Sequence, residues 1–211
     1  IQEIVPQGIT FNNDGTKMFI VGSGEYEVNE YSLSTAFDVS TASYTQVFSV
    51  AGQDTYPTDI TFNKDGTKMF VAGNGGDDIN EYTLSTGFDV STASFVDSFD
   101  VSSQDTAPNG LTFNSDGTKI FAISSNGTLN IHTLTTPYDI SDSSQEADDG
   151  INYIAGIGGG DGTVASRDIE FNNDGTKMYL LDGGNTASGD GGVVEYDLGT
   201  PFVPSTATSV N

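Results

Sequence analysis

Short runs of alternating apolar and polar residues recur along the whole chain. Residues 59–63 alternate, and residues 68–73 contain consecutive apolar side chains. Alternation is typical of a strand buried on one face, and a short continuous apolar run is typical of a strand covered on both faces. Further strands are predicted at residues 79–84 and at 94–101, the last being more polar, as expected at an outer edge. No segment keeps a helical period with caps, so the pattern predicts an all-β chain with almost no helix.

The same pattern occurs four times. Each copy has an Asn-x-Asp-Gly-Thr segment between its first two strands, in which Asp can bond the local backbone and Gly can take a positive φ. The turn aspartates are Asp14, Asp65, Asp116 and Asp174, with spacings of 51, 51 and 58 residues. Each turn is followed by a second shared segment, at residues 29–43, 80–94, 130–144 and 194–208. The chain is therefore built from four copies of one unit of about 50 residues.

Four antiparallel strands in such a unit are typical of a β-propeller blade. The shared string FNxDGTKMF, followed by EYxLSTxFDVSTAS, resembles the YVTN/NHL-like propeller repeats and uncharacterised surface propellers of marine bacteria or phages. The resemblance implies an all-β propeller, most simply four-bladed with four antiparallel strands per blade. It also implies an extracellular, cell-surface or virion-associated location. It says nothing of chemistry, because propellers host many unrelated functions.

The copies predict one propeller domain over residues 1–211. The blades are expected at about residues 7–51, 58–102, 109–153 and 167–211, with residues 1–6 completing the outer strand of the last blade and closing the ring. Such a ring would be a monomer. The alternative is part of a longer array, which would be open alone and would pair with another chain as a dimer.

The charge of the chain excludes several partners. Thirty Asp and Glu against six Lys and Arg give a net charge of -24, which disfavours nucleic acids and anionic membrane surfaces. With no Cys and one His, a disulfide framework, a thiolate zinc site and a His-based triad are all excluded. His132 aligns with Tyr31, Tyr82 and Tyr196, so we expect it to fill a structural aromatic position.

The copies differ most around the fourth blade. Two insertions, at residues 157–163 and 183–192, are expected at the same end of the ring. Arg167 is the one basic residue outside the repeated turns, and Asp59 and Asp168 stand where the other two copies have glycine. Asp54 and Asp105 lie in the preceding linkers. These positions predict an acidic, oxygen-rich channel mouth with a single guanidinium.

The pattern favours a recognition or adhesion module that binds a glycan or a surface protein at this face. Carboxylates, amides and an aromatic ring suit neutral sugars, and the candidate ligand-binding residues are Arg167, Asp168, Asp161, Asn185, Asp190 and Tyr56. Asp59 and Asp168 are the candidate ligands for a Ca²⁺ ion, since calcium prefers oxygen donors. The alternatives are a carboxylate- or calcium-dependent hydrolase, lactonase-like or glycosidase-like, and a purely structural spacer. No pair among the acidic residues is marked out for catalysis, so binding is preferred to enzymatic activity.

Overall fold

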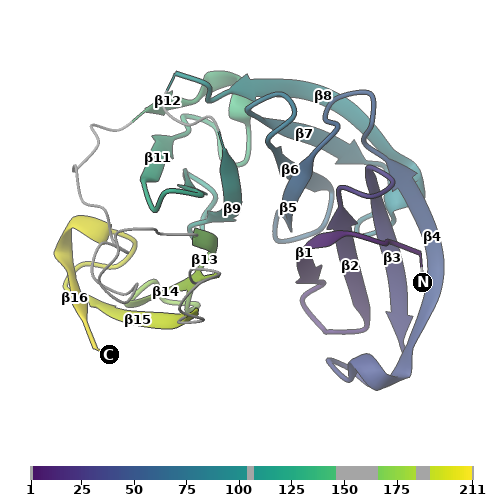
Figure 1. Ribbon diagram of the computed structural model, residues 1–211, viewed down its shortest axis with the longest axis horizontal. Helices are drawn as coiled ribbons and strands as arrows, with labels where there is room; N and C mark the ends of the chain where they lie inside the picture. Colours follow the sequence, from purple (N-terminus) through teal and green to yellow (C-terminus); the bar gives the residue numbers. More distant parts are fainter. Residues whose placement is uncertain (1, 104–106, 146–165, 184–190, 211) are drawn as a thin grey trace. The chain divides into compact units, whose positions relative to one another are not determined.

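The structure is a computed structural model that describes residues 2–103, 107–145, 166–183 and 191–210. Its strands form four antiparallel sheets of four strands each, in which the strands lie in the order of the sequence (Figure 1). Each sheet is one blade. The chain divides into two compact units, residues 1–103 and 104–211, and each unit contains two blades. The all-β prediction is confirmed, because the helical residues described are confined to four 3-10 turns of three residues each.

The first unit holds blades 1 and 2. Blade 1 consists of β1 (Pro6–Phe11), β2 (Lys17–Gly22), β3 (Glu27–Leu33) and β4 (Ala42–Ser49), with the 3-10 turn η1 (Val39–Thr41) before the outer strand. Blade 2 consists of β5 (Pro57–Phe62), β6 (Lys68–Gly73), β7 (Asp78–Leu84) and β8 (Ala93–Asp100), with η2 (Val90–Thr92) in the same place. The four strands predicted in this copy are thus confirmed, with bounds that agree within two residues.

The second unit holds blades 3 and 4. Blade 3 consists of β9 (Pro108–Phe113), β10 (Lys119–Ser124), β11 (Leu129–Thr133) and β12 (Ser144–Gln145), with η3 (Ile140–Asp142). Blade 4 consists of β13 (Ser166–Phe171), β14 (Lys177–Asp182), β15 (Gly192–Leu198) and β16 (Ala207–Ser209), with η4 (Pro204–Thr206). The described residues contain no helix with the length and apolarity needed to cross a membrane.

The turn between the first two strands is built identically in every blade. In blade 1 the Asp14 carboxylate accepts hydrogen bonds from the backbone N–H of Thr16 at 3.0 Å and from its hydroxyl at 2.5 Å, and Gly15 takes a φ of 70°. Phe37, which itself has a φ of 58°, donates its N–H to the Gly15 carbonyl at 2.9 Å. A Cβ on Gly15 would lie 2.4 Å from the Phe37 ring. The second shared segment therefore holds the turn between the first two strands in place. Only Gly at position 15 leaves room for the Phe37 ring.

Within each unit, two blades pack face to face. We call the face of a blade that meets the following blade its front face, and the face that meets the preceding blade its back face. In the first unit, the front face of blade 1 packs on the back face of blade 2, and both are buried. The core residues are Phe19, Val21 and Val28 on the front face and Ile60, Met69, Val71 and Val90 on the back face.

The second unit repeats this packing with blades 3 and 4. Phe121, Ile123 and Leu129 form the front face, and Ile169, Met178, Leu180 and Val194 form the back face. We call the packed interface between two blades of one unit a joint. Each joint contains the same pair of aromatic rings. Phe19 lies 4.6 Å from Phe62, measured between ring centroids, and Phe121 lies 4.6 Å from Phe171. One joint geometry thus serves both units.

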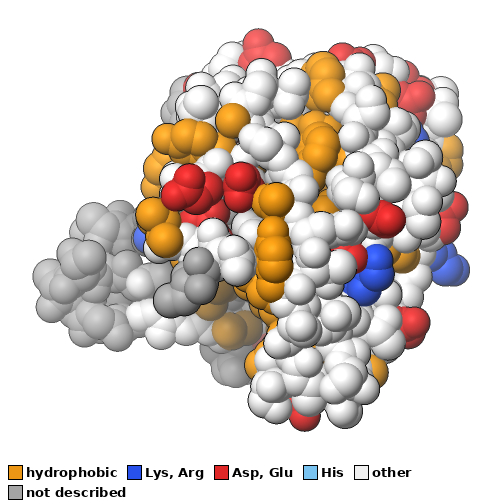
Figure 2. Space-filling view, turned by 90° about the vertical axis from the view of Figure 1, so that its right-hand side faces the viewer, with side chains coloured by type: hydrophobic (Ala, Val, Ile, Leu, Met, Phe, Trp, Pro, Cys, Tyr) orange, Lys and Arg blue, Asp and Glu red, His pale blue; other side chains and the backbone are white. Residues whose placement is uncertain are grey.

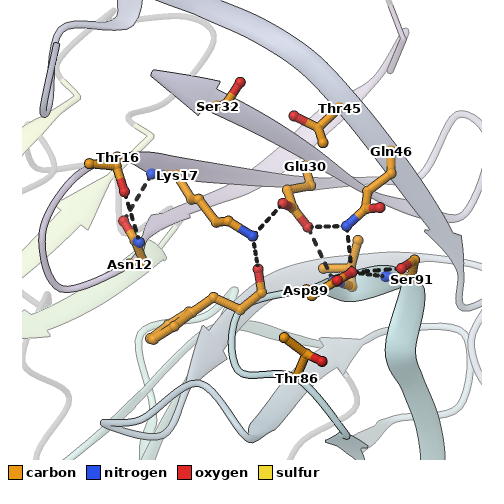
Figure 3. A network of polar contacts seen from close by, with 12 residues as sticks. Asn12, Thr16, Lys17, Glu30, Ser32, Thr45, Gln46, Thr86, Asp89 and Ser91 are labelled. Atoms are coloured by element: carbon orange, nitrogen blue, oxygen red, sulfur yellow. Dashed lines mark hydrogen bonds and ion pairs between the residues drawn. The ribbon is translucent and has the colours of Figure 1, made fainter. Parts of the chain in front are cut away.

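A polar network fastens the joint of the first unit (Figure 3). The Glu30 carboxylate pairs with Lys17 at 2.7 Å and accepts a hydrogen bond from the backbone N–H of Val90 in blade 2 at 3.1 Å. Lys17 donates to the carbonyl of Phe88 at 2.6 Å, so the pair reaches across to blade 2 with both partners. Gln46 donates to Glu30 at 2.7 Å and to Asp89 at 2.6 Å. Lys17 therefore contributes to the packing of blade 1 on blade 2 as well as to the turn that precedes it.

Candidate functional site

The inner strand of blade 4, β13, departs most from the other inner strands. It carries Arg167, Asp168 and Glu170 within one six-residue strand. Glu170 occupies the position of Thr10, Thr61 and Thr112 in the other copies, and our sequence analysis missed it. Its signal is plain in the repeat alignment, because one charged residue replaces three threonines. Residues two apart on a strand share a face, so Asp168 and Glu170 project together.

The two carboxylates line an open pocket of about 230 Å³. Across the sheet Asp168 pairs with Leu181, which pairs with Val193, while Glu170 pairs with Tyr179. These rows place two acidic groups at the inner edge of the pocket and an aromatic and two aliphatic side chains beyond them. The lining residues are Asp168, Ile169, Glu170, Tyr179, Leu181 and Val193. The pocket is thus polar along one side and apolar along the other.

The fold raises the pKa of both carboxyl groups. Burial raises the pKa of Asp168 to about 6, against the opposing effect of a 2.8 Å hydrogen bond from the backbone N–H of Ile169. Loss of surrounding water, together with the nearby Asp168 charge, raises the pKa of Glu170 to about 7. Glu170 is an exposed residue, so water screens much of this effect. The pair can therefore donate as well as accept hydrogen bonds at pH 7.

Glu170 also borders a second cavity. Thr112 in blade 3 donates its hydroxyl to the Glu170 carboxylate at 3.3 Å, next to a space of about 170 Å³ between blades 3 and 4. This space is lined by Thr112, Phe113, Ser115, Glu170, Phe171, Asn172, Asn173 and Phe202. Glu170 thus borders both cavities of the second unit, so a change in its charge alters the electrostatic potential in both.

The structure brings together only part of the predicted site. Arg167 is exposed beside the half-buried Asp168, as neighbours on β13. Tyr56 and Asp59 belong to the first unit, where Tyr56 is exposed and Asp59 is buried against Gly8. The predicted site residues Asp161, Asn185 and Asp190 lie outside the described residues.

The predicted calcium site of Asp59 and Asp168 is a pairing between the two units and stays a prediction. Among the residues that the structure describes, no group of three or more His, Cys, Asp or Glu side chains could hold a metal ion. Calcium normally takes six to eight oxygen ligands, so carbonyl oxygens or water would have to supply most of them here.

Asp54 corrects one expectation about the acidic mouth. It is buried, and its carboxylate accepts hydrogen bonds from the backbone of Tyr56, from Gly75 at 3.3 Å and from Gly76 at 2.9 Å. Glu3 does the same in blade 1, where it accepts from Val5 at 2.7 Å and from Gly24 at 3.1 Å. These linker carboxylates anchor the turn between the second and third strands, because they satisfy its exposed N–H groups. Asp54 is thus a structural group and contributes nothing to a ligand surface.

The N-terminal segment has contacts within its own blade. Val5 accepts a hydrogen bond from the backbone of Ser23 at 3.1 Å, and Pro6 begins β1. Closure of a ring by residues 1–6 stays a prediction. His132 is fully buried in β11, which agrees with its expected structural position.

No protein-family model and no curated protein matches the chain. Solved structures resemble it at low sequence identity. A putative 6-phosphogluconolactonase from Bacteroides fragilis is 13% identical, with a TM-score of 0.59 over 98% of this chain and 53% of that one. The β-propeller domain of Cps50 (Swd1) from Myceliophteria thermophila is 12% identical, with a TM-score of 0.54 over 84% of this chain and 50% of that one.

A third similar structure is the nidogen/laminin complex, with 14% identity and a TM-score of 0.61 over 98% of this chain and 64% of that one. The chain spans about half the length of the first structures that it resembles. At this identity the likeness concerns the fold alone. Together with the four meandering sheets, it shows that the chain has the fold of a β-propeller with four blades.

Proposed function

We propose that the chain is a recognition module that binds a neutral polyhydroxylated ligand, such as a glycan, at β13. The observation that carries the proposal is the replacement of the repeat residues Gly and Thr by Asp168 and Glu170 on one strand, at the rim of a pocket. Residues that serve only the blade are shared by the copies, whereas Glu170 is found in no other copy and Asp168 is matched only by Asp59 of blade 2. A glycan on a cell surface or virion, or a glycosylated surface protein, is the corresponding partner.

The pocket chemistry supports this ligand class. Carboxylates accept hydrogen bonds from sugar hydroxyls, the partly protonated Glu170 can also donate one, and Tyr179 offers an aromatic ring. Arg167, exposed next to Asp168 on β13, supplies a fork of donors outside the pocket itself. With a net charge of -24 on the chain, a neutral ligand binds without the repulsion that an anionic ligand would meet.

A glycan array followed by calorimetry on the binding sugars tests the proposal. Asp168→Gly and Glu170→Thr restore residues found in other copies, so both should fold and both should weaken binding at least tenfold. Glu25→Thr, at an exposed position in blade 1, is the matched control and should bind like the wild type. Absence of any ligand at millimolar concentration, or equal binding by all four proteins, would refute the proposal.

Calcium remains part of this proposal as a bridging ion at the inner-strand carboxylates. Its chemistry there would be to hold sugar hydroxyls through its open coordination positions. Binding measured in excess Ca²⁺ and again in excess chelator separates a bridged ligand from one that the carboxylates hold directly.

One observation favours a hydrolase as the second candidate. Two carboxyl groups with pKa values of about 6 and 7 border one pocket, which is the pairing that general acid and base catalysis requires. A putative lactonase among the similar structures acts on a phosphorylated lactone by its name, but the lone Arg167 on β13 suits an uncharged substrate better. Turnover of unphosphorylated lactones or aryl glycosides that vanishes in Glu170→Gln would establish this candidate, and no turnover would exclude it.

A further inference from the structure

Two departures from the repeat meet at the joint between blades 3 and 4. Glu170 stands where the other copies have threonine, and Ser115 stands at the variable position of its turn, where blade 1 has Asn13. Both residues line the cavity of about 170 Å³ between these blades, whose inner strands β9 and β13 are neighbours (Figure 1). We call this space the turn cavity. All the residues that line it belong to the second unit, so it is complete within one compact part of the chain.

The first unit shows how the equivalent place is spanned when the repeat residues are kept. There Asn13 of blade 1 donates its side-chain amide to the carbonyl of Lys64 in blade 2 at 2.5 Å, so the two turns are tied together. In the second unit the equivalent residues are Ser115 and Asn173, and a serine side chain is shorter than an asparagine side chain. Space therefore remains between the turns of blades 3 and 4 at the place where an amide connects the turns of blades 1 and 2.

The walls of the turn cavity combine aromatic rings with a carboxylate. The rings of Phe171 and Phe202 lie 5.3 Å apart between centroids, and Phe113 adds a third ring to the lining. Glu170 accepts one hydrogen bond, from the hydroxyl of Thr112 at 3.3 Å, and a carboxylate can accept several more. Aromatic rings attract an organic cation through their π faces, and a carboxylate attracts it through its charge. The lining is therefore suited to a positively charged head group.

The charges around the turn cavity favour the same ligand class. None of the described residues that line it is a lysine or an arginine, and the two turns that border it carry Asp116 and Asp174. Hydrogen bonds from Thr118 lower the pKa of Asp116, and those from Thr176 lower the pKa of Asp174, so both are ionised at neutral pH. Acidic side chains are also more widespread than lysines and arginines on the surface that Figure 2 shows, in keeping with the net charge of -24. This field attracts cations and repels anions.

We propose that the turn cavity binds the head group of an organic cation, an ammonium or guanidinium group, between Glu170 and the phenylalanine rings. Its volume is below the roughly 300–1,000 Å³ of pockets for drug-sized ligands, so it suits one head group and not a larger molecule. Ser115 and Asn173 are exposed, so the head group can enter from solvent. The proposal does not rest on glycan binding, because the turn cavity shares only Glu170 with the pocket proposed for the glycan.

An NMR titration of the isotope-labelled protein with tetramethylammonium chloride, at constant ionic strength, tests the proposal. Saturable shifts are expected at the backbone amides of Ser115 and Asn173 and not at the equivalent Asn13 and Lys64. tert-Butanol has a similar shape without the charge, so it is the matched ligand control and should bind about tenfold more weakly or less. No saturable shift, or equal affinities for the two probes, would overturn the proposal.

Substitutions separate this site from the glycan pocket. Ser115→Asn restores the side chain that connects the turns of the first unit, so it should fold, abolish tetramethylammonium binding and leave glycan binding unchanged. Asp168→Gly should weaken only glycan binding, because Asp168 lines only that pocket, whereas Glu170→Thr should weaken both. Glu25→Thr, exposed in blade 1, is the control and should match the wild type. Cation binding that persists in Ser115→Asn would overturn the proposal. Cation binding lost in Ser115→Asn, with no glycan bound by any of the proteins, would support it and refute the glycan proposal.

A second set of probes distinguishes the two sources of such a cation, a free small molecule and the side chain of a basic peptide. Methylammonium and methylguanidinium present the free head groups, and short end-capped peptides with one central lysine or arginine present the same groups on a side chain. A peptide that binds at least about tenfold more tightly than its free head group would identify a basic peptide as the ligand, and equal affinities would identify a small cation. Peptide binding that persists in Ser115→Asn would overturn the assignment to the turn cavity.

Discussion

In each blade, one aromatic residue with a positive φ fixes the turn between the first two strands. Phe37, Phe88, Tyr138 and Phe202 all have φ values between 56° and 58°, which is strained for an aromatic residue. Each donates its backbone N–H to the turn glycine of its blade, and its ring covers that glycine. The strain persists because both the hydrogen bond and the ring contact fix the loop. This explains why an aromatic residue in the second shared segment and the DGT turn recur together in all four copies.

Gly66 and Gly52 give a matched pair for this contact. Gly66→Ala should lower the free energy of unfolding by about 2–4 kcal/mol, because Gly66 has a φ of 72° and a Cβ would lie 2.2 Å from the Phe88 ring. Gly52→Ala meets nothing within 4 Å and should change stability by less than about 1 kcal/mol. Chemical denaturation measures both. Equal effects of the two substitutions would contradict the proposed role of the contact between the turn glycine and the aromatic ring.

Glu170 should make stability depend on pH. The folded protein raises the pKa of this carboxyl from 4.5 to about 7, so between these values it retains a proton that the unfolded chain releases. Stability attributable to this group therefore falls as pH rises from about 4.5 to 7 and is constant above. The melting temperature of the wild type, relative to Glu170→Gln, should drop between pH 4.5 and 7.5. The exposed Glu25→Gln serves as control, and parallel pH profiles for all three proteins would contradict the raised pKa.

At the scale of elements, the same ion pair has different surroundings in different blades. Glu30 is covered by blade 2 and bonded to its backbone, whereas Glu195 keeps contact with solvent. Removing one member of a buried pair leaves the other charge without compensation, whereas an exposed pair contributes little. Whether another blade covers the pair, and not its residue types, therefore decides how much the pair contributes to stability.

Glu30→Ala should therefore destabilise the protein by about 3 kcal/mol and Glu195→Ala by less than about 1 kcal/mol. The two substitutions remove the same side chain beside the same type of lysine. Urea denaturation of the two variants and the wild type compares them. A larger loss for Glu195→Ala would contradict the assignment of Glu30 to the joint.

Most strands could be predicted because alternation and turn chemistry are local signals. The predicted strand at residues 68–73 coincides with β6, and the other strands of that blade shift by at most two residues. The role of Lys17 could not be predicted, because its partner Glu30 comes from the third strand and its carbonyl contact from the next blade. Asp54 was misplaced for a similar reason, since burial depends on a turn about 20 residues away.

The candidate site was predictable only in part. Arg167 and Asp168 could be selected because they depart from the repeat, and the structure places both on β13. Glu170 departs from the repeat equally, but it was overlooked inside a strand that reads as ordinary blade sequence. Its altered pKa depends on the pocket and on the charge of Asp168, which no linear pattern expresses.

For the molecule as a whole, charge opposes compactness. A net charge of -24 on 211 residues generates repulsion that added salt screens. Raising NaCl from low concentration to about 0.5 M should raise the melting temperature of the wild type. A scan by differential scanning calorimetry checks this. A fall in melting temperature with salt would mean that ion pairs such as Lys17–Glu30 outweigh the general repulsion.

The contact between Gly8 and Asp59 limits how such proteins can be engineered. A Cβ on Gly8 would lie 2.7 Å from the Asp59 Cα, and one on Gly110 would lie 2.6 Å from the Asp168 Cα, so the close approach of the next blade's backbone requires a glycine at both positions. A consensus design that averaged the four copies and placed Asp in every blade would force backbones apart at these joints. A consensus with Gly in every blade would relieve the crowding, but it would also erase Asp168. Idealised propellers based on this chain therefore need a two-blade building block.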